Sequence, residues 1–344
     1  MNFMGMEGFA WFTGVVEERQ DPLRLGRVKV RMFGLHSAKK SKGETEGIPT
    51  EDLPWAYPMQ PITSAAVNGI GTTPLGPVEG THVVGFFRDG KNCQDPVVMG
   101  TLGGFPLEEA GVAGFNDPNK LYPKKDYLKE PDTNRRAVVD FIDPLEKKPA
   151  ISKETPLSEA YESEDGLAKK RAQDKKVPKA MDTTNTWDEP LDPYAAQYPF
   201  NHVRESESGH IEEWDDTPEA ERLMKWHKSG TFEEVHPSGQ RVFKVVRNNY
   251  TIITGDDFVH IKKRIDPDTE EEIEGNLSIT VDGNCDTLVR GDNNLHVEGN
   301  YNVLVEGNWN VDVLKNTTIK TVGVKNDESA LNHNIRGKVV HLNQ

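Results

Sequence analysis

The sequence predicts an all-β protein in three parts: a small N-terminal barrel, an extended linker, and a C-terminal β-helix wound from three chains. Glycine (30) and proline (22) are abundant among the 344 residues, which favours turns and extended structure over helix. Short strand patterns fill the first third of the chain, and an eight-residue repeat runs through residues 275–322. We place the boundaries at 1–115, 116–200 and 201–344.

Residues 1–115 contain several short strand candidates. Residues 12–18 are rich in β-branched side chains, and in 28–33 apolar side chains alternate with Lys29 and Arg31, the period of a half-buried strand. Residues 81–87 and 96–99 flank a turn rich in Asp and Gly. Five or six such strands fit a closed barrel of the OB type.

Residues 116–200 have a different composition. They hold 17 acidic and 15 basic residues, repeated prolines and little apolar periodicity. Because such a segment buries too little apolar surface to fold alone, we expect a linker draped over another surface. Residues 167–176 are a candidate short helix, and the three aromatics in 192–200 are candidate anchors.

From residue 201 onward the pattern indicates strands again. Turn dipeptides recur at Ser208-Gly209, Ser229-Gly230 and Ser238-Gly239. They predict either hairpins or the irregular start of a solenoid.

The eight-residue repeat is the strongest pattern in the chain. Five units begin with Gly-Asn or Gly-Asp, at Gly275, Gly283, Gly291, Gly299 and Gly307. The fifth and seventh positions of the units are mostly apolar, and the sixth and eighth are mostly polar. Each unit is therefore interpreted as a short strand closed by a glycine able to adopt positive φ. The side chains assigned to the inside are Ile279, Val281, Val289, Leu295, Val297, Val303, Val305, Val311, Val313 and Ile319.

The length of the repeat predicts the oligomeric state. A single-chain β-helix needs a coil of at least about 18 residues to enclose its own core, and small repeats bury their faces only by stacking. Eight residues supply about one side. Three chains wound around one axis would supply the others and leave no open sheet edge, so the pattern predicts an intertwined homotrimer.

The sequence contains few patterns that indicate a catalytic, metal-binding or nucleic-acid-binding site. A net charge of −15 argues against nucleic-acid binding, and two cysteines exclude any four-cysteine metal site. No HExxH, GxSxG, Walker A or GxGxxG motif occurs, so we expect no catalytic residue, metal or cofactor.

Two groups of side chains leave alternatives open. The carboxylates Glu212, Glu213, Asp215 and Asp216 fit a glycosidase pair, but acidic pairs on a solvated face are commoner. His333 and His341 would meet their copies on a trimer axis and bind a metal, although ordinary exposed histidines are the more frequent case.

Six stretches resemble a known family. WFTGVVEERQDPLRLGRVKVRMFGLHS (11–37), residues 47–71 and GPVEGTHVVGFF (76–87) are similar to the N-terminal OB domain of the central baseplate spike of T4-like contractile-tailed phages. ESGHIEEWDDTPEAER (207–222), HKSGTFEEVHPSGQR (227–241) and the octads resemble the C-terminal β-helix of that spike, a tail-associated lysozyme family.

The resemblance implies a structural protein of the virion tail baseplate, made in the host cytoplasm. Its OB domain would bind a trimeric hub, and its β-helix would carry a PAAR-type tip protein and puncture the outer envelope of the host when the sheath contracts. In the best-known relative a lysozyme domain separates the two parts. Here only residues 116–200 occupy that place, so we expect no lysozyme. The alternatives are a tail-associated peptidoglycan or polysaccharide hydrolase and an effector spike like those of type VI secretion.

Overall fold

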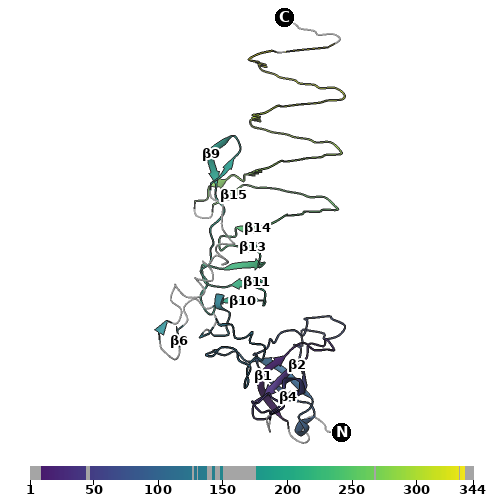
Figure 1. The fold of residues 1–344 in the computed structure, drawn as a ribbon. Helices are drawn as coiled ribbons and strands as arrows, with labels where there is room; N and C mark the ends of the chain where they lie inside the picture. Colours follow the sequence, from purple (N-terminus) through teal and green to yellow (C-terminus); the bar gives the residue numbers. More distant parts are fainter. Residues whose placement is uncertain are drawn as a thin grey trace. The chain divides into compact units, whose positions relative to one another are not determined.

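The computed structural model describes residues 9–43, 47–125, 128–129, 131–137, 142–143, 148–149, 176–266, 269–332 and 334–337. These residues form β-strands and short 3-10 helices and no α-helix (Figure 1), which confirms the all-β prediction. The chain divides into two compact units, one of Met1–Val177 with Trp187–Asn276 and one of Pro178–Thr186 with Leu277–Gln344. The domain boundaries given above stay predictions.

The N-terminal part is a closed five-stranded barrel. Its strands are β1 (Trp11–Glu18), β2 (Val28–Met32), β3 (Trp55–Pro58), β4 (His82–Phe87) and β5 (Pro96–Thr101). They follow the order β1-β2-β3-β5-β4, and β4 closes on β1. Only the β3–β5 pair is parallel. Closure leaves this sheet without a free edge, as the OB-type prediction requires.

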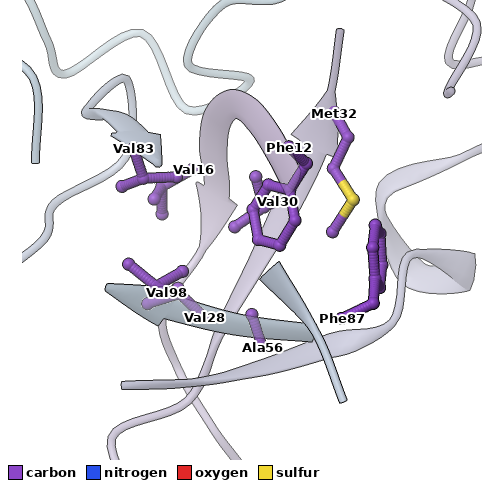
Figure 2. Close-up of a cluster of buried hydrophobic side chains, with 9 residues drawn as sticks. All are labelled: Phe12, Val16, Val28, Val30, Met32, Ala56, Val83, Phe87 and Val98. Atoms are coloured by element: carbon purple, nitrogen blue, oxygen red, sulfur yellow. The ribbon is translucent and has the colours of Figure 1, made fainter. Parts of the chain in front are cut away.

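One apolar cluster fills the barrel (Figure 2). Phe12 and Phe87 pack with ring centroids 5.1 Å apart. Gly85 sits where an added Cβ would lie 2.5 Å from the ring of Phe12, so no larger residue fits there. The members of the cluster are Phe12, Val16, Val28, Val30, Met32, Ala56, Val83, Phe87 and Val98.

Strand β2 differs from the prediction of a half-buried strand, because both of its faces are buried. Arg31, on the face away from the core, is fully buried and donates from Nε to Oε1 of Glu17 across 2.6 Å. Its Nη1 and Nη2 donate to the carbonyls of Ser37 and Ile48, so residues of the β2–β3 connection cover this face. The alternation was visible in the sequence, but these covering residues were not.

A second sheet follows the linker. It consists of β10 (Asn201–Glu205), β11 (Ile211–Asp215), β12 (Arg222–Trp226), β13 (Phe232–Val235) and β14 (Arg241–Lys244), antiparallel and in sequence order. Gly209, Gly230 and Gly239 lie in three of its turns with φ of 85°, 95° and 79°. The three Ser-Gly dipeptides therefore mark hairpins, the first of the two predicted alternatives.

The remaining elements are short. The 3-10 helices are η1 (Thr50–Asp52), η2 (Gly90–Asn92) and η4 (Arg135–Ala137). Three small hairpins pair β6 (Ile142–Asp143) with β7 (Lys148–Pro149), β8 (Val177–Lys179) with β9 (Asp182–Trp187), and β15 (Arg264–Ile265) with β16 (Glu272–Ile273). All but the last residue of the candidate helix at 167–176 lie outside the described residues.

Candidate functional site

The octads form an open coil of extended chain. Paired bends recur at 282–283, 290–291, 298–299, 306–307, 314–315, 322–323 and 330–331, a spacing of eight residues. Between the bends the chain is extended, and Figure 1 shows this part as wide, separate turns. Among the described octad residues, no backbone N–H donates to another backbone carbonyl of the same chain. Extended backbone of this kind lacks the partners that strands require.

The side chains assigned to the inside pack against no core of their own chain. All ten are exposed, and the seventh-position valines share one environment, with exposed fractions between 42% (Val297) and 51% (Val281). The fifth-position side chains are more exposed, from 52% at Val303 to 72% at Ile279. These side chains form a regular stripe of exposed apolar residues, the kind of surface that often marks an interaction site. The trimer-core assignment itself remains a proposal.

The glycines that begin the octads do not use the backbone conformation expected of them. None of Gly275, Gly283, Gly291, Gly299 and Gly307 has φ in the left-handed region. At the last four, an added Cβ would meet nothing within 4 Å of this chain. Their own chain therefore does not explain why these positions are glycine.

The inner face of the β10–β14 sheet has an apolar end and an ionic end. Ile211, Met224, Trp226 and Phe232 form the apolar end, where the rings of Trp226 and Phe232 stack at 5.5 Å. The ionic cluster at the other end consists of Arg136, Glu213, Arg222, Glu234 and His236, all of them buried.

Arg222 is the centre of the ionic cluster. Its Nη1 lies 2.9 Å from Oε1 of Glu234, and its Nη2 contacts Glu213. His236 Nε2 lies 2.9 Å from the other oxygen of Glu234. Burial opposes the charge of Arg222, but the two carboxylates outweigh it and raise the pKa of Arg222 above its ordinary value.

This arrangement corrects one sequence interpretation. Glu213 and Asp215 do not belong to a solvated acidic face, because they are 1% and 2% exposed. Glu213 is held between two guanidinium groups, those of Arg222 and Arg136, and Asp215 accepts a 2.6 Å hydrogen bond from the hydroxyl of Thr217. Neither carboxylate faces a cleft open to a glycan.

Two segments from residues 116–200 cover the ionic end of the sheet, and the linker assignment as a whole stays a prediction. Arg136 of η4 inserts its guanidinium beside Glu213, 5.2 Å from the ring of Tyr194. The carbonyl of Arg136 accepts from the Tyr194 hydroxyl (2.7 Å) and from Nδ2 of Asn201 (2.9 Å). Burial raises the pKa of Tyr194 to about 12, so it stays a hydrogen-bond donor.

Of the three aromatics predicted as anchors, Tyr194 alone is partly buried. Tyr198 and Phe200 are 62% and 39% exposed. Sequence reasoning missed Arg136, Arg222 and Glu234 altogether. The period-2 pattern of β11–β13 carried a signal, because it gives Arg222 and Glu234 the same parity as their apolar neighbours Met224 and Phe232.

A second group of polar contacts, the Glu207 junction, involves three side chains. They are Arg19, which directly follows β1, Tyr122 of the linker, and Glu207 of the β10–β11 turn. Arg19 donates from both Nη atoms to Glu207 at 2.8 Å, and Tyr122 donates its hydroxyl to Oε1 at 2.7 Å. The hydrogen bonds from Arg19 and then Tyr122 lower the pKa of Glu207 to about 2. Burial and the hydrogen bond to Glu207 raise the pKa of Tyr122 to about 12.

The described residues contain neither a metal-ligand cluster nor a membrane-spanning helix. No group of three or more His, Cys, Asp or Glu side chains is arranged to hold a metal ion there. In the same part of the chain, no helix has the length and apolar character needed to span a bilayer. His333 and His341 lie outside the described residues.

The architecture defines an OB-barrel protein with a C-terminal octad segment. The sequence model of the Gp5 N-terminal OB domain matches residues 34–178. The chain is 50% identical over 288 residues to Protein Gp5 of Vibrio phage KVP40, covering 81% of this chain and 64% of the relative. It is 53% identical over 116 residues to the pre-baseplate central spike protein Gp5 of Enterobacteria phage T4, covering 33% and 20%.

The chain is therefore similar to the Gp5 proteins of these two phages, and its residues 34–178 match the model of the Gp5 N-terminal OB domain, which confirms the resemblance. It spans less than two thirds of the length of these curated relatives.

Proposed function

We propose that this protein is the central spike of a contractile phage tail baseplate, a virion component that acts as a homotrimer. The observation that carries the proposal is the octad coil, whose bends recur every eight residues while its backbone has no ladder partner in its own chain. Two further copies would satisfy the backbone and cover the valine stripe. The relation to a protein named as a pre-baseplate central spike supports the same role.

Each part then has a mechanical task. The barrel binds a trimeric hub, the octads form a needle, a PAAR-type protein caps the C-terminal end, and the outer envelope of the host is the target. Extended chains hydrogen-bonded to their neighbours along the whole shaft resist buckling and unfold slowly. Puncture driven by sheath contraction needs no catalytic residue, so we propose a non-enzymatic spike without lysozyme activity and without a cofactor.

The test is the mass of the purified chain in solution, measured by light scattering before and after mild heating in detergent. A trimer that persists in detergent is the expected result. A monomer at all concentrations would overturn the proposal. Lysis of permeabilised cells by the purified trimer, followed as loss of turbidity, would instead favour the hydrolase alternative.

A further inference from the structure

The connection between β3 and β4 contains no charged side chain. Residues 53–78 hold no Asp, Glu, Lys or Arg, although 28% of the chain is charged. We call residues 59–78, the part that follows β3, the uncharged loop. Surface segments usually carry charged side chains, so the composition of this loop indicates a surface that another molecule covers.

Hydrogen bonds within the uncharged loop define its shape. Residues 67–70 form a tight hairpin turn, in which Asn68 and Gly69 have positive φ (52° and 78°) and the N–H of the last residue donates to the carbonyl of the first at 2.9 Å. The backbone N–H of Thr72 donates to Oγ of Ser64 at 3.2 Å and connects the two arms of the loop. A loop held in one conformation loses little conformational entropy when it binds a partner.

The loop is also attached to the barrel at both ends. The backbone N–H of Met59 donates to the carbonyl of Val98 on β5 at 2.7 Å. Near the other end, a Cβ added at Gly26 would lie 2.4 Å from the carbonyl oxygen of Pro74, so the β1–β2 turn packs directly against the loop. The uncharged loop is therefore a fixed extension of the barrel.

The side chains that the loop presents to solvent are apolar. None of its residues is buried. Ile62 is fully exposed, and Ile70 and Leu75 are exposed at 68% and 74%. Met59 and Val67 are exposed at 50% and 58%. Single exposed apolar residues are ordinary, but five in one short loop are typical of an interaction surface.

Charge favours a second copy of this chain as the partner. Each chain has a net charge of −15, so like-charged surfaces of neighbouring copies repel each other. This repulsion is weakest where the surface carries no charge, as along the uncharged loop. In a trimer held by its shaft, the other two copies are also present at an effective concentration on the order of millimolar.

We propose that the uncharged loop of each chain packs against a neighbouring copy in the trimer. This inference rests on the proposed homotrimer and adds a contact between copies at the barrels, separate from the octads. The contact covers Ile62, Ile70 and Leu75, which a single chain leaves in water. It fixes the barrels relative to one another as well as the shaft.

The experiment places the photoreactive residue p-benzoylphenylalanine at position 62 of the full chain. Irradiation of the purified protein should give bands at two and three times the chain mass on a denaturing gel. Leu107, which is 54% exposed outside the loop, is the matched control position and should give the monomer band alone. Ile70→Asp should abolish the crosslinks from position 62, because it places a carboxylate in the contact, whereas Leu107→Asp should leave them unchanged. All three positions are exposed in the single chain, so each variant should fold, as circular dichroism would verify.

Light scattering on the same samples separates this inference from the proposed function. A trimer that gives no crosslinks between copies from position 62 would overturn the inference and leave the proposed function standing. A chain that stays monomeric would overturn the proposed function and this inference with it. Crosslinks to a different protein in assembled virions, with none between copies, would assign the loop to another partner and equally overturn the inference.

Discussion

Arg222 on β12 donates from Nη1 to Oε1 of Glu234 on β13 across 2.9 Å, and both side chains are fully buried. The same guanidinium contacts Glu213 on β11, so one side chain connects three adjacent strands. Each charge is compensated only while the three strands keep their register. A one-residue slip would move Arg222 to the other face and leave two carboxylates buried without a cation.

Arg222→Met is therefore expected to be strongly destabilising. It leaves Glu213 and Glu234 buried with less compensation, and breaking such a pair typically costs about 3–5 kcal/mol. The measurement is the free energy of unfolding by denaturant, or the unfolding rate if unfolding is irreversible. Arg241→Met is the matched control, because its pair with Glu233 is exposed at 65% and 42% and should contribute at most about 1 kcal/mol. Equal effects of the two variants would contradict this account.

The hydrogen bond between the Tyr194 hydroxyl and the carbonyl of Arg136 gives a second prediction. Tyr194→Phe removes the hydroxyl that donates to the carbonyl of Arg136 at 2.7 Å. We expect a loss of about 0.5–1.5 kcal/mol and faster amide hydrogen exchange in η4. Tyr198→Phe alters a ring that is largely exposed and should change neither quantity. If η4 exchanges at the same rate in both variants, the hydroxyl does not hold the linker.

The junction at Glu207 predicts a dependence of stability on pH. The pKa of Glu207 is lowered from its ordinary value of 4.5 to about 2 in the folded chain. A lowered folded-state pKa means that the contribution is fully present above about pH 4.5 and is lost as the pH falls through about 2. Because Glu207 is 49% exposed, solvent screening keeps the effect small.

The measurement is the thermal midpoint of the parent and of Glu207→Gln from pH 7 to pH 2. The parent should lose more stability than the variant between pH 4.5 and pH 2. Glu274→Gln, at an exposed position, should follow the parent curve. Parallel curves for the parent and Glu207→Gln would show that the junction contributes nothing.

Features fixed by interactions between residues close in the sequence could be predicted, whereas features fixed by distant residues could not. The barrel strands, the Ser-Gly hairpins and the spacing of the octads were predictable because alternation and turn residues act over a few positions. The partners of Arg31 and Arg136 were not, since Glu17 and Glu213 are distant in the sequence and no local pattern connects them. The octad glycines show a related limit, because φ at these positions does not require glycine.

The trimer proposal gives the sharpest prediction, at adjacent positions of one octad. Val297→Asp would place three carboxylates close to one axis, where each charge would be buried without a cation, so assembly should fail. His296→Asp adds the same side chain at the neighbouring position, which alternation turns to the other face of the strand. Light scattering should report a trimer for His296→Asp and smaller species for Val297→Asp. If Val297→Asp forms an equally heat-stable trimer, the assignment of the seventh positions to the inside of the shaft is wrong.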